Sequence, residues 1–260
     1  MHVGKINFQL GTFPNGVSVP FGNIYIIKEE NKMQKLNVIY EDNQIIVVEK
    51  PVNIPSQADK TGDVDMLSLV KAYIKEKYNK PGQVYLGLVH RLDRPVGGVM
   101  VFARTSKAAA RLSEQIRLKQ FEKKYLVIAD GKFDKNKGTL HDYLLKNERL
   151  NTSKVVKEGT KNSKLAILDY EVLKYNEEIN LSLIKVNLHT GRHHQIRVQL
   201  ANSGHSICGD QKYGTRGRGK QICLWAYELT IIHPITKEKI TFKVLPEKIG
   251  SWKMLDEVQI

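Results

Sequence analysis

Short runs of β-forming residues follow one another along most of this chain, and few helix patterns separate them. The runs cover residues 36–40, 45–48, 84–89, 99–103, 124–129, 139–145, 165–173 and 181–188. Helix patterns occur at residues 65–78, 105–118 and 193–202. Because strand and helix do not alternate regularly, the chain is predicted to be α+β, with a mixed, mostly antiparallel sheet and flanking helices.

The first helix pattern carries its own start signal and an apolar face. Asp65 is expected to cap the helix, because aspartate accepts hydrogen bonds from the free N–H groups of a first turn. Leu67, Val70, Ile74 and Lys77 are expected to share one face.

Regular patterning begins only after Met33. Glycine and proline are frequent before it, which indicates loops with a short strand or two. The chain is therefore predicted to consist of an N-terminal extension at residues 1–33 and a compact domain at residues 34–260.

The charge balance favours a polyanionic partner. Forty-one Lys and Arg residues against 27 Asp and Glu residues give a net charge of +14 among 260 residues. RNA or DNA is the first candidate and an anionic membrane surface the second, whereas an evenly spread charge would serve only solubility.

The sequence has neither a membrane-spanning or signal segment nor a metal-binding cysteine pattern, and this limits the compartment in which the protein is expected. No stretch of 18 apolar residues occurs, and the start lacks a continuous apolar signal segment, so membrane insertion and secretion are not expected. Cys208 and Cys223 have no metal-binding spacing, which favours a reducing compartment, the cytoplasm, and argues against a structural zinc site.

Asp93 lies in a loop between two predicted strands, between Arg91 and Arg94 and just before Pro95. Adjacent cations favour the ionised form of a carboxylate. An ionised aspartate near the tip of a loop can act as a nucleophile or general base, whereas most loop aspartates only stabilise a turn. Both interpretations stay open from these residues alone.

A second candidate cluster occupies residues 189–197, where His-Thr-Gly-Arg-His-His-Gln-Ile-Arg leads from a strand end into a helix. His193 and Arg197 are four residues apart and are expected to share a helix face. A buried Arg197 would need an anionic partner, because leaving it unpaired costs on the order of several kcal/mol. Asp93 is the predicted partner. The alternative is an exposed Arg197 whose stem lies on the surface.

Basic and aromatic residues are interleaved at residues 117–125 and 212–220. Cations can hold phosphates while rings stack on unpaired bases, although solvated faces have the same pattern. Residues 214–220 also match the Gly-x-x-x-x-Gly-Lys spacing of a phosphate loop. Gln221 stands where that loop needs a hydroxyl residue, and no apolar strand runs into it, which argues against a nucleoside triphosphatase.

Three motifs together resemble those of the RluA-type pseudouridine synthases. They are His-Arg-Leu-Asp at residues 90–93, Thr-Gly-Arg-His-His-Gln-Ile-Arg at 190–197 and Gly-Asp-Gln-Lys-Tyr-Gly at 209–214. The resemblance runs from about residue 36, through Lys50-Pro51, to residues 224–234, so it covers nearly all of the chain after Met33. The chain is expected to adopt the catalytic fold of that family.

The resemblance implies isomerisation of a uridine in structured ribosomal or transfer RNA to pseudouridine, without cofactor or metal. The bond from ribose C1′ to base N1 is broken and remade to C5. By this analogy Asp93 is the catalytic carboxylate, Arg197 pairs with it, and Tyr125 lies against the target base. Arg91 is the expected helper in flipping the base out of the RNA.

The same resemblance gives six residues expected to bind RNA, and Leu224 among them is expected to add apolar packing near the base. They are His90, Arg91, Lys124, Arg192, His194 and Leu224. A monomer is expected.

The chain also departs from the family pattern. The family loop commonly continues past the aspartate with Thr-Ser-Gly, whereas residues 94–98 read Arg-Pro-Val-Gly-Gly and keep only the last glycine. Which groups hydrogen-bond this loop is therefore open. The residues before the domain are too few for the S4 RNA-binding domain of many members, so no S4 domain is expected. The altered loop also supports an alternative function, a member without turnover that acts as an RNA chaperone.

Overall fold

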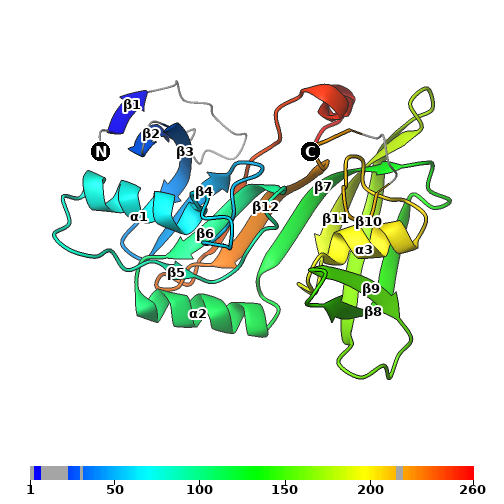
Figure 1. Ribbon diagram of the computed structural model, residues 1–260, viewed down its shortest axis with the longest axis horizontal. Helices are drawn as coiled ribbons and strands as arrows, with labels where there is room; N and C mark the ends of the chain where they lie inside the picture. The colour runs from blue at the N-terminus through cyan, green and yellow to red at the C-terminus, as the bar shows by residue number, and fades with distance from the viewer. Residues whose placement is uncertain (1–2, 7–22, 30–31, 215–218) are drawn as a thin grey trace. The chain divides into compact units, whose positions relative to one another are not determined.

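The computed structural model describes residues 3–6, 23–29, 32–214 and 219–260 (Figure 1). Much of the N-terminal segment predicted to form loops, and the middle of the basic segment 212–220, lie outside these residues. The chain divides into two compact units. The first comprises Met1–Phe121 and Thr230–Val244, and the second Glu122–Leu229 and Leu245–Ile260.

The first unit is built on an antiparallel sheet. Its neighbouring strands are, in order, β1 (Val3–Ile6), β2 (Asn23–Glu29), β3 (Lys32–Glu41), β4 (Ile45–Lys50) and β6 (Gly97–Ala103), with β5 (Gly87–Leu88) also on β6. Strand β12 (Leu224–Ile232) passes from the second unit into the first and pairs with β13 (Lys239–Lys243). Strand β6 is buried along its whole length, so it forms the centre of this core.

Two helices of the first unit begin where the sequence predicts. Helix α1 (Met66–Lys77) is capped by Asp65, whose side chain accepts from the backbone N–H of Ser68. Helix α2 (Ser106–Arg117) is capped by Thr105, which accepts from Ala108 N. Both caps satisfy donors that a first turn leaves without intrahelical partners.

The predicted face of α1 is only partly correct. Val70 and Ile74 are buried, but Leu67 is half-buried and Lys77 is exposed. Additional buried side chains are Met66, Leu69 and Tyr73. The buried face is therefore rotated from the predicted one, because Tyr73 can bury its ring while its hydroxyl donates to Glu41.

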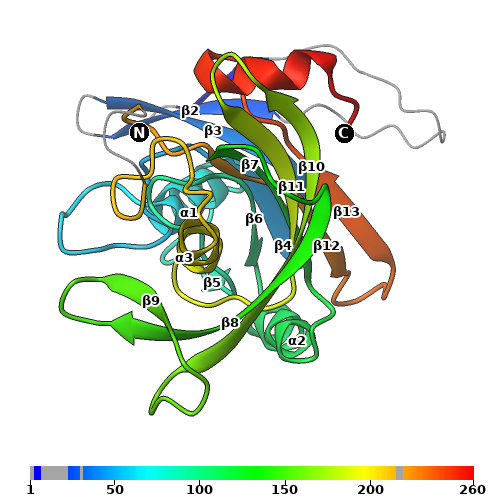
Figure 2. The ribbon, with the colours of Figure 1, turned by 90° about the vertical axis from the view of Figure 1, so that its right-hand side faces the viewer.

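The second unit contains the larger antiparallel ladder (Figure 2). Its neighbouring strands are β7 (Glu122–Asp130), β11 (Leu181–Leu188), β10 (Lys164–Asn176), β8 (Lys137–Asn147) and β9 (Thr152–Val156). Helix α3 (Gln195–Asn202) and the 3-10 helix η1 (Gly250–Glu257) complete it. The predicted α+β class with a mostly antiparallel sheet is confirmed.

One face of this ladder carries both α3 and Tyr125. Val198 of α3 packs against Leu144 and Ala166. Ala166 and Tyr170 are four residues apart on β10 and so point to the same face. The register places Tyr170 opposite Val186, and Val186 opposite Tyr125. The strand alternation therefore fixes Tyr125 on the side of the sheet that α3 covers.

Helix α3 is shorter than predicted. It begins at Gln195, because His194 before it has a left-handed backbone with φ of 54°. His193 is therefore not a helical residue, and the expectation that it shares a helix face with Arg197 is wrong. Its ring instead contacts Ser153 Oγ at 2.9 Å and Asn151 Oδ1 at 3.0 Å.

Within the ranges that the structure describes, no helix combines the length and the apolar character needed to cross a membrane.

Candidate active site

Asp93 lies in the loop that joins β5 to β6 in the first unit. Its side chain is half-buried, and its backbone carbonyl accepts a hydrogen bond from Val96 N at 2.9 Å. This bond closes a tight turn around Pro95. The carboxylate is therefore carried by a turn with its own internal hydrogen bond.

The side chain of Lys50 holds this turn from the end of β4. The residue is fully buried, and its ammonium donates to the carbonyls of Pro51, Arg94 and Val96 at 3.0, 3.0 and 2.7 Å. Burial lowers the pKa of Lys50 to about 7, while the negative charge of Asp93 acts in the opposite direction. The amine thus links β4 to the backbone that follows Asp93.

Ser56 holds the other side of the turn. Its buried hydroxyl donates to Leu92 O at 2.8 Å, and accepts from Leu92 N at 3.2 Å. Lys50 and Ser56 together bind the backbone of residues 92–96. The loop therefore has hydrogen bonds from neighbouring segments, although it lacks the two hydroxyls of the family pattern.

Arg94 is engaged away from Asp93. Its guanidinium forms an ion pair with Asp63 and approaches Asp59 at 3.6 Å. Of the two neighbouring arginines expected to favour an ionised Asp93, this one is therefore committed to other carboxylates. Lys50 is a cation close enough to Asp93 to feel its charge. The two residues are far apart along the chain, so sequence patterns alone do not reveal that they are close.

The remaining candidates of this loop have different surroundings. His90 Nε2 accepts from Val101 N at 3.0 Å, and its ring packs edge-on against Phe121. These contacts hold the start of the loop against β6. Arg91 is exposed and has no hydrogen bond or ion pair within the described part of the chain.

In the second unit, Arg197 is buried with 4% of its side chain exposed, so the surface alternative is wrong. An anionic partner is present, but it is Asp210, which the sequence did not predict: Nε and Nη2 donate to the two carboxylate oxygens of Asp210 at 2.7 and 2.6 Å. Burial opposes ionisation of Asp210, but Arg197 and the N–H groups of Lys212 and Tyr213 outweigh it and lower its pKa. The result is a two-pronged buried ion pair.

Tyr213 covers this ion pair. The Arg197 guanidinium lies over its ring, 5.2 Å from the centroid. The Tyr213 hydroxyl accepts from Ser153 N at 2.7 Å and contacts Nδ1 of His194 at 2.8 Å. A single aromatic residue thus joins β9, the segment before α3 and the Arg197–Asp210 pair.

The turn that presents Asp210 requires two glycines. Gly209 has φ of +75°, and a Cβ there would lie 2.0 Å from Gln221 O. A Cβ on Gly214 would lie 2.5 Å from Asp210 O. The glycines of the motif at residues 209–214 are therefore explained by close backbone approach.

The other candidates of this unit differ in exposure and pairing. Tyr125 is buried on β7, and Leu224 is buried at the start of β12. Lys124 pairs with Glu228 at 2.6 Å and, as the neighbour of Tyr125, points to the opposite face. Arg192 is exposed, with Nε bonded to Leu165 O at 2.8 Å.

Asp93 belongs to the first unit, whereas Tyr125 and Arg197 belong to the second. The pairing of Asp93 with Arg197 stays a prediction.

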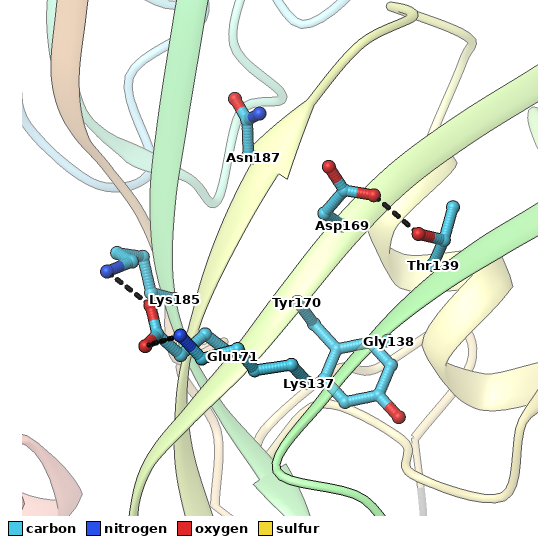
Figure 3. A pocket seen from close by; sticks show the side chains of 8 residues that line it. All are labelled: Lys137, Gly138, Thr139, Asp169, Tyr170, Glu171, Lys185 and Asn187. Carbon is cyan, nitrogen blue, oxygen red and sulfur yellow. Dashed lines mark hydrogen bonds and ion pairs between the residues drawn. The ribbon is translucent and has the colours of Figure 1, made fainter.

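Residues of β8, β10 and β11 line a pocket on the second unit (Figure 3). By the strand register, the charged residues among them point to the face opposite Tyr125. Glu171 lies between Lys137 and Lys185 at 2.8 and 2.5 Å, and Thr139 donates to Asp169 at 2.7 Å. These charges neutralise one another across neighbouring strands. Among the described residues, no group of three or more His, Cys, Asp or Glu could hold a metal ion.

Comparisons with known proteins show the family to which the chain belongs. The family model for RNA pseudouridylate synthase matches residues 44–202. An uncharacterized RNA pseudouridine synthase of Bacillus subtilis is 34% identical over 210 residues, covering 79% of this chain and 67% of that protein. Ribosomal large subunit pseudouridine synthase C of Haemophilus influenzae is 31% identical over 229 residues, covering 84% and 68%.

The human protein RNA pseudouridylate synthase domain containing 4 shares the fold, with a TM-score of 0.68 at 22% identity. The superposition covers 81% of this chain and 88% of that one. Because the family model matches more than half of the chain, the chain belongs to the RNA pseudouridylate synthase family, as an RluA-type enzyme.

The first prediction concerns Lys50. Lys50→Met should lower the rate of uridine conversion by about 10²-fold with little change in KM, because a displaced loop misplaces the carboxylate of Asp93, the predicted catalytic residue. Single-turnover kinetics on an RNA substrate measure this. Lys107→Met, an exposed lysine of α2, should keep the wild-type rate.

The pH dependence of stability gives an independent measure of Lys50. Its pKa is lowered on folding, so the unfolded chain binds more protons between about pH 7 and the usual lysine pKa near 10. The wild type should therefore gain stability relative to Lys50→Met as the pH rises from 7 to 10. A constant difference in urea unfolding across that range would contradict a buried, proton-releasing amine.

The second prediction concerns Asp210. Asp210→Asn should lower the free energy of unfolding by about 3 kcal/mol, because it leaves a buried guanidinium without its carboxylate. The pKa of Asp210 is lowered in the folded state, so its contribution is present at neutral pH and is lost as the pH falls through that pKa. Urea unfolding at pH 7 and in acid measures both effects.

The matched control is Asp134→Asn, which changes an exposed aspartate of the same unit. It should leave stability within about 0.5 kcal/mol of the wild type. Equal effects of the two substitutions at pH 7 would show that the Arg197–Asp210 pair does not stabilise the unit.

Proposed function

We propose that this RNA pseudouridine synthase isomerises a specific uridine of structured RNA, with Asp93 as the nucleophile. The observation that carries the proposal is the support of the Asp93 turn by the buried side chains of Lys50 and Ser56. A nucleophile must be held within a fraction of an ångström of its target, and a turn fixed at both sides meets this need.

The target uridine is flipped out of the RNA before reaction. A base in a stack or pair cannot present C1′ and C5 to one pocket, and extrusion costs roughly a few kcal/mol. Arg91, exposed and unpaired within the described residues, is suited to fill the space that the base leaves. The net charge of +14 favours the RNA backbone.

Arg197 pairs with the Asp93 carboxylate in the working site and favours its ionised form. The ionised oxygen attacks either C1′ of the ribose or C6 of the base, and both routes use the same residues. In the C1′ route an ester bond forms between Asp93 and C1′ as the C1′–N1 bond breaks, the base turns, and C5 bonds to C1′ as the ester bond breaks. In the C6 route the Asp93–C6 bond that forms is broken again after C1′–N1 has been exchanged for C1′–C5. In both routes the proton lost from C5 is matched by one gained at N1. Tyr125 stacks against the base and helps to keep water from the detached intermediate.

The relatives named as ribosomal large subunit synthases make ribosomal RNA the first substrate to test and transfer RNA the second. We propose a cytoplasmic monomer in which residues 34–260 form the catalytic domain and residues 1–33 an extension. His90, Lys124, Arg192, His194 and Leu224 stay proposed RNA contacts.

The third prediction concerns the nucleophile. Asp93→Asn and Asp93→Ala should reduce conversion by about 10⁴-fold or more, because removing a nucleophile removes the covalent route. Pseudouridine mapping of cellular RNA from a gene deletion complemented with each variant measures the loss, and Asp134→Asn should restore the modification. A modified site in cells carrying Asp93→Ala would refute this role. Disturbed RNA folding with no missing pseudouridine in the deletion would favour the chaperone function instead.

The fourth prediction concerns the guanidinium. Arg197→Lys should lower the conversion rate by about 10²-fold, because a point charge cannot bind two carboxylates with planar geometry. The rate under saturating RNA measures it, and Arg149→Lys, an exposed arginine, is the control. Wild-type turnover by Arg197→Lys would remove the support for the Asp93–Arg197 pair.

A further inference from the structure

Lys123 is a second cation on the face of the sheet that carries Tyr125. The two residues are separated by one position on β7, so their side chains point to the same side. The Lys123 ammonium lies at the loop before α3, where a Cβ added to Gly191 would be 3.3 Å from Nζ. The absence of a side chain at Gly191 leaves room for the amine.

The amine of the half-buried Lys123 is partly desolvated, and no described residue compensates it with an opposite charge. Burial lowers the pKa of Lys123. Lys50, the other desolvated lysine, donates to three carbonyls, and Lys124 pairs with Glu228. Across the described residues, Lys123 has neither a hydrogen bond nor an ion pair. Desolvating a charge is unfavourable unless an opposite charge is bound, so the fold itself does not account for this lysine.

The surroundings of Gly191 suit an external anion. Arg192, the next residue, is exposed and contributes a second cation to the same loop. Gly191 is exposed and presents only backbone. A compact tetrahedral anion can approach two cations across a glycine more closely than it could across a larger residue.

We propose that Lys123 binds one phosphodiester of the substrate RNA, next to the nucleotide that enters the Tyr125 face of the sheet. This inference rests on the proposed function, because RNA is the polyanion that the enzyme engages. The phosphate supplies the charge partner that the described residues do not give Lys123. Lys123 then fixes the position of the backbone beside the flipped nucleotide, while Tyr125 contacts the base.

The test combines protein variants with backbone-modified RNA. The probe is a synthetic stem-loop that carries the mapped target uridine, and a series of the same RNA in which one flanking linkage at a time is a neutral methylphosphonate. Affinity is measured over a range of salt concentrations for the wild type, Lys123→Met and Lys123→Arg. Lys137→Met is the control, since it removes an exposed lysine from the opposite face of the sheet.

Lys123→Met should weaken binding by about tenfold and reduce the slope of log Kd against log salt by about one, as expected for one lost phosphate contact. In the wild type, one methylphosphonate should cause a similar loss, and Lys123→Met should be insensitive to that linkage. Lys123→Arg should retain most of the affinity. With Lys137→Met, the methylphosphonate at that same linkage should weaken binding as much as it does with the wild type.

The proposal would be overturned if each methylphosphonate weakened binding by the same factor in the wild type and in Lys123→Met. Unchanged affinity of Lys123→Met with a lower single-turnover rate would also overturn it, and would assign Lys123 to the chemical step instead. Thermal unfolding of each variant checks that the fold is intact. If the wild-type protein converted no uridine, the proposed function would be refuted. If the enzyme were active but Lys123→Met bound RNA as the wild type does, only the inference about Lys123 would be refuted.

Discussion

Burying a charged side chain is unfavourable unless fixed partners replace its water, and this constraint shapes the candidate residues of each unit. Lys50 satisfies it with three backbone carbonyls, two of them from the segment that follows Asp93. Arg197 satisfies it with the carboxylate of Asp210. In each unit the cation and the loop it binds must keep one geometry, because moving either leaves a desolvated charge.

Because side chains alternate along β7, Lys124 points to one face of the sheet, and Lys123 and Tyr125 point to the other. Lys124 faces the side on which Glu228 and the cross-strand pairs of β8, β10 and β11 neutralise charge. Lys123 and Tyr125 face the side that α3 covers. Among the described residues, one face of the sheet carries paired charges and the other carries Lys123 without an ion pair, so the strand register places the proposed phosphate contact of Lys123 on the second face.

Local signals predicted the fold well, and tertiary contacts were beyond them. Helix α1 begins after Asp65, as predicted, because a cap acts within one turn. The predicted start of α3 is too early. The left-handed backbone conformation before the helix belongs to His194, and no glycine in the sequence indicates it. Strand β9 was missed because it is short and polar and pairs with one neighbour. The need of a buried Arg197 for an anion was predicted, but its burial stayed open beside the surface alternative. The role of Asp210 depends on a turn that only the folded chain forms.

The Asp210 contact also bears on how Arg197 can serve Asp93. A guanidinium has five N–H donors in one plane, and the pair with Asp210 uses one edge, through Nε and one hydrogen of Nη2. A second carboxylate can therefore be bound at the other edge while the first holds the plane in place. Asp210 lies beyond residues 44–202, the segment that the family model matches, yet it orients a residue inside that segment. The orientation of the proposed catalytic arginine thus depends on the later turn at residues 209–214, which Tyr213 ties to β9 and to the start of α3.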